Sequence, residues 1–217
     1  MDAPHHDLAR LGRQHHGPGL REDELGDDPL VEVACWIDDA VGGGAADATA
    51  VQLATVDAEG RPAVRTVLLK GLDERGFQFF TNHESRKGRH LAANPHCALV
   101  LFWRALDRQV TVTGTAERLS DEESDAYFAT RPRGSQIGAW ASRQSSVIAG
   151  RHELERAAAE VEARFAGADI PRPEWWGGYV IRPDTVELWH GRDDRLHDRI
   201  RYTAEPGGGW RRERLSP

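Results

Sequence analysis

Two cations at the start of a predicted helix are the first residues whose chemistry stands out. Ser85 is a favourable N-cap, and Arg86 and Lys87 follow it directly, a few residues after Phe80 and Thr81. Cations in the first turn are electrostatically unfavourable, because the helix N-terminus carries free N–H groups and the positive end of the helix dipole. They become favourable where an anion such as phosphate binds. The segment therefore predicts either an anion site or a solvated charge pair.

A second candidate is the strand-like segment RTVLLK, which begins at Arg65 and ends at Lys70. Side chains alternate between the two faces of a strand, so a spacing of five would put these cations on opposite faces, in contact with different ligand groups. An isolated pair with this spacing is also typical of the solvated ends of an apolar strand. The residues alone favour that second interpretation.

A third candidate combines segments that are far apart in the sequence: Tyr127, Arg131, Ser135, Gln144, Ser145, Trp189, Arg195, His197 and Arg199. Arg195 and His197 are two residues apart, so a strand would place both on one face and Asp198 on the other. A solvated charged loop explains the same pattern. Only additional evidence would join these segments into one site.

Motifs for other chemistries fail. The sequence has no GxGxxG, GxxxxGK[ST], GxSxG or CxxC pattern, and its two cysteines make neither a disulfide framework nor a zinc site. His83-Glu84 begins like a zinc-protease motif, but Lys87 stands where the second histidine is needed. The remaining histidine-rich stretch is a polar tail with His5, His6, His15 and His16. We expect no bound metal.

The charge distribution indicates what kind of ligand to expect. The 217 residues have a formal net charge of −7, yet residues 61–151 hold 14 basic and 9 acidic side chains, a net charge of +5. A basic centre in an acidic protein favours a small anionic ligand over nucleic acid, which would usually make the whole domain basic. The longest apolar run, residues 97–103, is far below the ~20 residues of a membrane span, and the N-terminus lacks the apolar core of a secretory signal. We expect a cytoplasmic protein that binds neither nucleic acid nor a membrane.

The elements that must position these residues are mainly short strands. Residues 1–27 are polar and predict a flexible arm, followed by one domain over residues 28–217. Strands are predicted at 50–56, 65–69, 77–81, 97–103, 109–119, 179–181, 186–189, 199–202 and 210–215, and helices at 29–42, 86–94, 121–130 and 147–166. Consecutive strands with tight turns predict an antiparallel sheet that closes into a barrel with peripheral helices. The fold class is therefore mainly β.

Taken together, several segments resemble the pyridoxamine 5′-phosphate oxidase family, the flavin enzymes that make pyridoxal 5′-phosphate. They are RTVLLKG, FFTNHESRKG, LDRQVTVTG, YFATRPRGSQIGAWASRQS, WWGGY and ELWHGRDDRLHDRIRY, and they occur in the family's order and spacing over residues 28–217. The resemblance implies an antiparallel FMN-binding split β-barrel. It also implies a homodimer with FMN at the subunit interface.

The resemblance also implies roles for individual residues. From one subunit, FMN would be contacted by Arg65, Thr66, Val67, Leu68, Leu69, Lys70, Phe80, Thr81, Arg86, Lys87 and Gln109, and from the other by Gln144, Ser145, Trp189 and Arg199. The substrate phosphate would be bound by Lys70, Tyr127, Arg131 and Ser135, with Arg195 and His197 as the catalytic pair over the pyridine ring. The implied reaction converts pyridoxamine or pyridoxine 5′-phosphate to pyridoxal 5′-phosphate and reduces O2 to H2O2.

The N-terminal arm departs from the family pattern RxxYxxGGL. Gly12 stands in place of the arginine and His15 in place of the tyrosine, which leaves the substrate preference open. Two alternatives therefore remain. One is an FMN oxidase of the same fold for another ring substrate, such as a phenazine-pathway precursor, and the other is a non-catalytic protein that binds flavin or pyridoxal phosphate. The cations and hydroxyls at the implied phosphate site favour a phosphorylated substrate.

Overall fold

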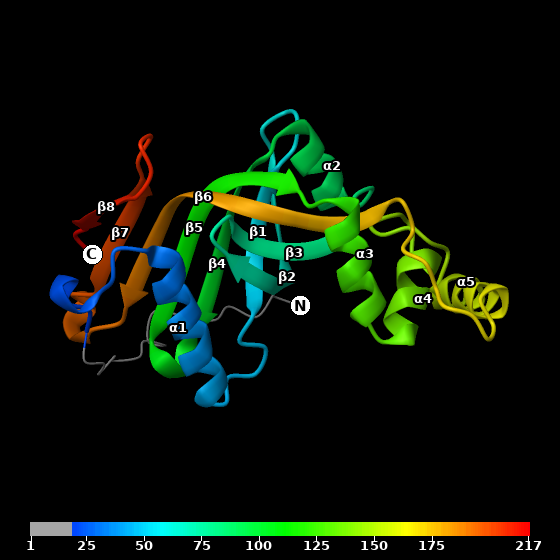
Figure 1. Cartoon of the computed structure of the whole chain (residues 1–217), viewed down its shortest axis with the longest axis horizontal. Coiled ribbons are helices and arrows are strands. Elements are labelled where there is room, and N and C mark those ends of the chain that lie inside the picture. Colours follow the sequence, from blue (N-terminus) through cyan, green and yellow to red (C-terminus); the bar gives the residue numbers. More distant parts are fainter. Residues whose placement is uncertain (1–18) are drawn as a thin grey trace, which may run out of the picture.

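A closed antiparallel barrel forms the centre of the computed structural model, which describes residues 19–217 (Figure 1). The strand order is β3-β2-β1-β4-β5-β6, and pairing between β3 and β6 closes the barrel, while β7 and β8 extend the sheet beyond β6. All of these pairings are antiparallel. Closure pairs most of the barrel's strand edges, which would otherwise invite pairing with other chains. The predicted fold class is confirmed.

The elements alternate along the chain between the sheet and its periphery. The strands are β1 (Ala50–Val56), β2 (Pro62–Asp73), β3 (Gly76–Asn82), β4 (His96–Trp103), β5 (Arg108–Arg118), β6 (Trp176–His190), β7 (Asp198–Ala204) and β8 (Trp210–Arg214). The α-helices are α1 (Pro29–Gly42), α2 (Arg86–Ala93), α3 (Asp121–Thr130), α4 (Arg133–Ala141) and α5 (Arg151–Arg164). None of the helices within residues 19–217 is both long and apolar enough to cross a membrane.

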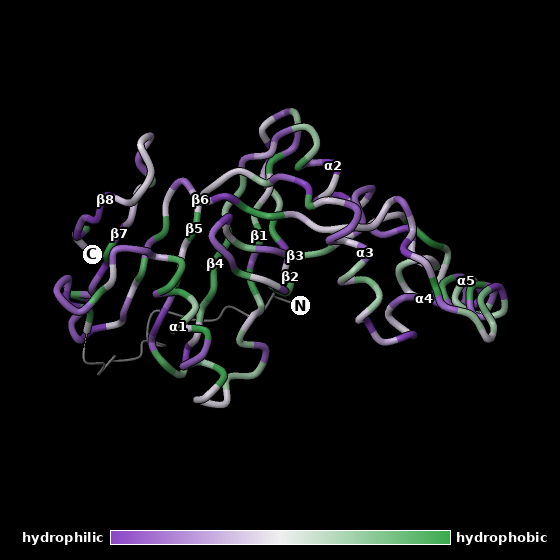
Figure 2. Tube along the Cα trace, in the orientation of Figure 1, coloured by the Kyte–Doolittle hydropathy of each residue, from purple (hydrophilic) through white to green (hydrophobic). Residues whose placement is uncertain are grey.

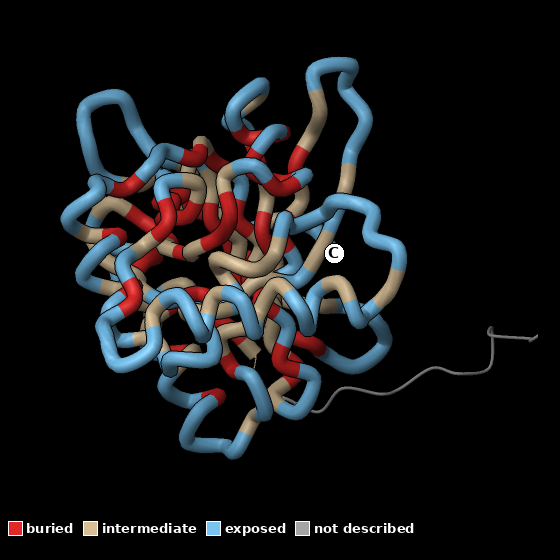
Figure 3. Tube along the Cα trace, turned by 90° about the vertical axis from the view of Figure 1, so that its right-hand side faces the viewer, coloured by how far each residue is buried: buried red, intermediate tan, exposed pale blue. Residues whose placement is uncertain are grey.

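The core follows the period-two burial of the strands. Leu53, Leu99 and Leu188 are fully buried in the barrel, and Trp36 of α1 packs edge-on against Trp103 of β4, with ring centroids 6.5 Å apart. Figure 2 shows hydrophobic residues along the barrel strands and hydrophilic residues along β8. Figure 3 shows buried residues in the interior behind exposed helices, in agreement with the absence of buried residues in α4 and α5. The barrel thus supplies a rigid frame, and the helices lie outside it.

Two elements differ from the prediction. β6 is one strand of 15 residues rather than two, because a bulge in its pairing with β5 between Thr113 and Gly114 accommodates Pro183. α4 was not predicted, since Arg131-Pro132 was interpreted only as the end of α3. Pro132 is also the N-cap of α4, which packs against a second small core around Phe128 and Trp176.

The segment that precedes α1 is anchored to the far end of the sheet. Leu20 N donates to Asp198 Oδ2 at 3.0 Å, Arg214 Nη2 donates to Glu22 Oε2 at 2.8 Å, and Tyr202 Oη donates to the Gly26 carbonyl at 2.9 Å. Residues 19–27 thus contact the sheet through several hydrogen bonds, and the flexible arm over residues 1–27 stays a prediction. Gly12, His15 and the other residues of the histidine-rich tail lie outside the described residues.

Candidate functional site

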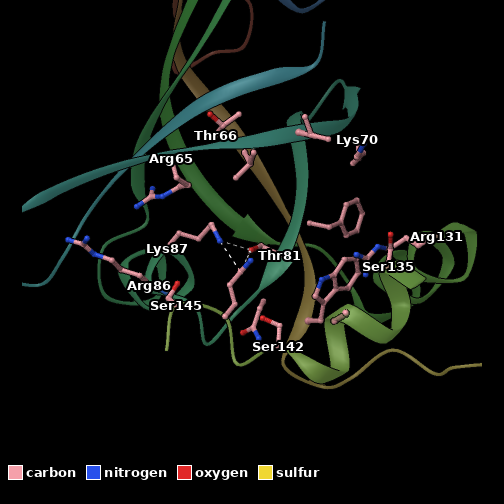
Figure 4. A pocket seen from close by; sticks show the side chains of 18 of the residues that line it. Arg65, Thr66, Lys70, Thr81, Arg86, Lys87, Arg131, Ser135, Ser142 and Ser145 are labelled. Atoms are coloured by element: carbon pink, nitrogen blue, oxygen red, sulfur yellow. Dashed lines mark hydrogen bonds between the residues drawn. The ribbon is translucent and has the colours of Figure 1, made fainter. Parts of the chain in front are cut away.

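A cavity of about 760 Å³ opens along a free edge of β2 (Figure 4). β2 pairs with β1 from Pro62 to Leu68, whereas its pairing with β3 begins only at Leu69. The other edge of residues 62–68 therefore has unpaired backbone groups that can bind a ligand. Side chains from both faces of the strand reach this edge, so Arg65 and Lys70 line the same cavity.

One end of the cavity gathers three cations, Arg65, Arg86 and Lys87, without a carboxylate among the lining residues. Lys87 is 8% exposed, and its Nζ donates to Thr81 Oγ1 and Gln144 Oε1, both at 3.0 Å. Burial and the neighbouring Arg65 lower the pKa of Lys87 to about 8. Burial, and then Arg86, also lowers the pKa of Arg65. Lys87 is buried and Arg65 is half-buried, and like charges that face no carboxylate in the cavity lining point to an anionic ligand at this end.

The first turn of α2 is held by the loop that follows α4. The Ser85 side chain accepts from Gly88 N at 3.3 Å, and Arg86 N donates to Ser145 Oγ at 3.1 Å. Ser145 has a φ of +75°, a conformation rarely adopted without a structural or functional reason. Gln144 and Ser145 thus share the cavity with Arg86 of the same chain. The expected division, with these two residues opposite Arg65 on another subunit, is not the one found.

The other end of the cavity holds Tyr127, Arg131 and Ser135, and Figure 4 shows Lys70 on the same side. The Arg131 guanidinium lies 4.5 Å from the Trp176 ring centroid, and its Nη1 is buried with no hydrogen-bond partner among the described residues. Burial lowers the pKa of Arg131. A planar cation with an unused buried donor is suited to bind a second anion.

Aromatic side chains pack next to Arg131 at this end of the cavity. Trp176 is 6% exposed and does belong to a core cluster, but its ring also lines the cavity beneath Arg131. Phe80 stacks on Tyr127 with ring centroids 4.0 Å apart. Ser142, which the sequence analysis missed, also lines the cavity. No local motif marks it, since only the turn after α4 brings it there.

The remaining predicted residues lie outside this cavity. Leu69 is buried in the core. Gln109, Trp189 and Arg199 are register neighbours across β5, β6 and β7, and His197 packs on Trp189 with ring centroids 4.8 Å apart. Their strand neighbours Val110, Leu188 and Ile200 are fully buried, so this row faces away from the core. Gln109 thus joins a second cluster rather than the cavity that holds Arg65.

The Arg195–His197 segment forms a turn, in agreement with the loop interpretation, and not a strand that would place both side chains on one face. Asp194 and Arg195 have φ values of +54° and +61°, and β7 begins only at Asp198. Left-handed backbone at two successive residues cannot continue a strand. Arg192 N donates to His197 Nδ1 at 3.0 Å, so a neutral His197 carries its proton on Nε2 and can donate it to a ligand.

Fold and site define a class of protein: an antiparallel barrel whose free strand edge borders a cation-lined cavity for anionic small molecules. Residues 37–165 match the family model described as pyridoxamine 5′-phosphate oxidase. Residues 176–217 match the pyridoxine 5′-phosphate oxidase C-terminal dimerisation region. The chain belongs to the pyridoxamine 5′-phosphate oxidase family, which confirms the resemblance found in the sequence.

Relatives and solved structures agree with this membership. The chain is 56% identical over 211 residues to a pyridoxine/pyridoxamine 5′-phosphate oxidase of Rubrobacter xylanophilus, with 97% of each chain covered. It is 52% identical to one of Cupriavidus taiwanensis, covering 97% of this chain and 99% of the relative. The structure of PhzG from Burkholderia lata in complex with tetrahydrophenazine-1-carboxylic acid is 30% identical, with a TM-score of 0.87 over 93% of this chain and 99% of that one.

Proposed function

We propose that this protein is an FMN-dependent oxidase that converts pyridoxamine 5′-phosphate or pyridoxine 5′-phosphate to pyridoxal 5′-phosphate and reduces O2 to H2O2. The observation that carries the proposal is one cavity with two cationic ends and no acidic lining residue. Such a cavity accommodates two phosphate esters, one on the cofactor and one on the substrate. Family membership supplies the reaction class.

The end with Arg65, Arg86 and Lys87 fits the phosphate of FMN. These cations face no carboxylate in the cavity, and their mutual repulsion is relieved when a phosphate binds. The unpaired edge of β2 offers alternating N–H and C=O groups for the polar edge of the flavin ring. The residues present therefore fit the cofactor.

The end with Arg131 fits the substrate phosphate. The Arg131 guanidinium can donate two parallel hydrogen bonds to phosphate oxygens, and its Nη1 has no hydrogen-bond partner within residues 19–217. Lys70 adds a point charge, and the hydroxyls of Tyr127 and Ser135 add donors. The Arg131 guanidinium lies 5.4 Å from the Phe128 ring centroid and 4.5 Å from that of Trp176, so cation–π contacts help to fix its position.

We further propose that a second copy of the chain completes the site with Gln109, Trp189, Arg195, His197 and Arg199. Gln109, Trp189 and Arg199 lie on the outer sheet face, Arg195 and His197 lie on the turn before β7, and Figure 1 shows β7 at the opposite end of the molecule from α3 and α4. Phe102, the register neighbour of Gln109, is 50% exposed and Leu196 is 70% exposed, as expected of surfaces that pack in a dimer. The match to the dimerisation region supports this arrangement.

The chemistry that FMN supplies when bound is acceptance of a hydride from the substrate C4′ carbon and transfer of the electrons to dioxygen. The chain's own residues bind and orient the substrate. Arg131 and Lys70 hold the phosphate, which fixes the position of the ring. His197 can donate through Nε2 and Arg195 supplies a positive charge, so the pair orients the substrate and stabilises charge as the hydride leaves.

Absorption spectroscopy and turnover test the proposal directly. The purified protein is expected to show flavin absorbance near ~450 nm and, in air, to convert pyridoxine 5′-phosphate to pyridoxal 5′-phosphate with release of peroxide. Protein that neither retains nor takes up flavin contradicts the proposal. Bound flavin without turnover or peroxide supports a non-catalytic binding protein instead.

A second candidate is oxidation of another ring substrate, and the similarity to PhzG favours it. A carboxylate on such a substrate could use the same cations near Arg131. Comparison of kcat/KM for pyridoxine 5′-phosphate, pyridoxine and a tricyclic carboxylic acid separates the two. We expect pyridoxine 5′-phosphate to be the best of the three. Higher efficiency with the tricyclic acid would favour the second candidate.

The lowered pKa of Lys87 predicts how FMN affinity depends on pH. Lys87 is charged below its pKa of about 8 and neutral above it, so affinity should fall as the pH rises through this value. Phosphate is already doubly charged in this range, so its own titration does not contribute. Loss of one charge-assisted hydrogen bond weakens binding about tenfold. Flavin fluorescence quenching between pH 7 and 9.5 measures the effect.

Lys87→Arg is the matched control, because arginine keeps its charge throughout this range. Its affinity should vary little with pH, even if it is weaker overall. A flat profile for the wild-type protein, or the same fall in Lys87→Arg, contradicts the assignment of Lys87 to the FMN phosphate.

A further inference from the structure

We propose that Thr55 and His90, neither of which lines the cavity, are positioning residues that hold the Arg65 guanidinium in place for the FMN phosphate; this inference rests on the proposed function. The two residues lie behind Arg65, on β1 and α2 respectively. They form a buried hydrogen-bonded chain that begins at a side chain of the cavity and ends on the helix that carries its other cations.

The contacts of Arg65 are partly buried, and the contact between Thr55 and His90 is buried. Arg65 Nη1 donates to the Leu53 carbonyl and to Thr55 Oγ1, both at 2.8 Å. Thr55 is fully buried, and its Oγ1 lies 3.2 Å from Nδ1 of His90, which is 7% exposed. Arg65 therefore has two fixed acceptors, and the side-chain acceptor is itself held by a second buried residue.

The direction of these hydrogen bonds follows from what each group can do. A guanidinium can only donate, so the Thr55 oxygen accepts from Arg65. The buried hydroxyl hydrogen then needs an acceptor, and His90 Nδ1 is the side-chain nitrogen next to it. Arg65 therefore donates to Thr55, and Thr55 donates to His90. This arrangement places the Thr55 lone pairs toward the guanidinium.

Such a support is needed because Arg65 is repelled by its neighbours. The nearby Arg86 contributes to the lowered pKa of Arg65, and Arg65 in turn contributes to that of Lys87. An unsupported guanidinium would relax away from the other cations toward solvent. Neutral acceptors hold it without cancelling its charge, whereas a carboxylate at the same place would compete with the phosphate.

The geometry also leaves the ligand-facing donors of Arg65 available. Both contacts use Nη1, and within the described part of the chain no hydrogen bond occupies Nε or Nη2. A phosphate can therefore take the remaining edge of the guanidinium in a two-pronged contact. His90 lies on α2, the helix that begins with Arg86 and Lys87. Its hydrogen bond to Thr55 therefore also connects α2 to β1.

The choice of residue at position 55 supports this role. β1 alternates buried and less buried residues, and Val51 and Leu53 occupy the same face as Thr55. Valine has the shape of threonine and suits a buried strand position better, because a buried hydroxyl must find hydrogen-bond partners. The hydroxyl at this core position is explained by its contacts to Arg65 and His90.

Binding of FMN and of riboflavin, which lacks the phosphate, to the ligand-free protein tests the inference. Thr55→Val removes the hydroxyl and keeps the shape, so FMN should bind at least about tenfold more weakly while riboflavin affinity changes less than about twofold. Thr55→Ser retains the hydroxyl and should restore FMN affinity. A purely structural role would weaken both ligands alike.

Two further variants complete the test. His90→Leu should weaken FMN binding less than Thr55→Val does, because Arg65 keeps its direct acceptor. In an Arg65→Ala background, Thr55→Val should cause no further loss, since it acts through Arg65. The inference is overturned if Thr55→Val binds FMN like the wild type, weakens riboflavin equally, or remains harmful without Arg65. If the wild-type protein fails to bind FMN, the proposed function is overturned and this inference with it.

Discussion

Arg195→Ala is expected to lose about 100-fold or more in kcat while it keeps FMN bound, as expected when a preorganised charge at the reacting centre is removed. Arg195 lies on an exposed turn, and its proposed place in the dimer is over the pyridine ring of the substrate. We therefore expect it to act on the substrate rather than on the cofactor. Steady-state turnover and the flavin content of the purified variant measure the two effects separately.

Arg182→Ala provides a control for loss of an exposed arginine, since Arg182 forms a surface ion pair with Glu117 on the barrel wall. It should retain wild-type turnover and flavin content. Loss of FMN from Arg195→Ala would place this residue on the cofactor instead. Unchanged turnover would contradict a catalytic role.

Arg131→Ala is expected to raise the KM for pyridoxine 5′-phosphate about 100-fold with a smaller change in kcat. The reason is that a guanidinium that binds the substrate phosphate contributes mainly to substrate binding. The variant also removes the partner of the Trp176 ring and leaves the cation site with Lys70 alone. Initial rates over a wide range of substrate concentration distinguish the two parameters.

Arg133→Ala is the matched control for this change. Arg133 lies two residues further along the chain, but its guanidinium binds Glu162 and the Phe165 carbonyl on the outside of the helices. Its KM should remain that of the wild type. An unchanged KM in Arg131→Ala, or an equal rise in both variants, would contradict the phosphate site.

The same two substitutions test whether one site is shared between two copies of the chain. In a two-fold dimer, a chain with Arg131→Ala and a chain with Arg195→Ala form one site with both arginines and one with neither. Assayed at substrate concentrations well below the raised KM of Arg131→Ala, co-expression at equal amounts should therefore restore about a quarter of wild-type activity. No recovery would mean that both residues serve a site within one chain.

Much of the local structure could be predicted from the sequence, because the signals are local. Asp28 accepts from Leu30 N at the start of α1, and Ser120 forms a capping box with Glu123 at the start of α3. The alternation of buried residues placed β1 and β4 within a residue or so. The boundary between α3 and α4 is harder to predict. Pro132 is typical of a helix end, but it is also the N-cap of α4.

The types of residue that make the candidate site were equally evident in the sequence. Cations in the first turn of α2 indicated either an anion site or a solvated charge pair, and the structure places Arg86 and Lys87 in the cavity with Arg65. Identifying such residues needs only their chemistry and their position relative to a helix N-terminus. Their grouping depends on contacts between distant segments.

The antiparallel strands, the helix starts and the set of charged residues can be predicted from the sequence, since they depend on side-chain type and short spacings. The free edge of β2 before Leu69, and the loop after α4 that brings Gln144 to Lys87, are evident only in the folded chain. The same holds for the position of Arg195 on a turn outside the cavity. The register of strand pairing and the paths of the loops bring together residues that are dozens of positions apart in the sequence. No local preference specifies which of these residues meet.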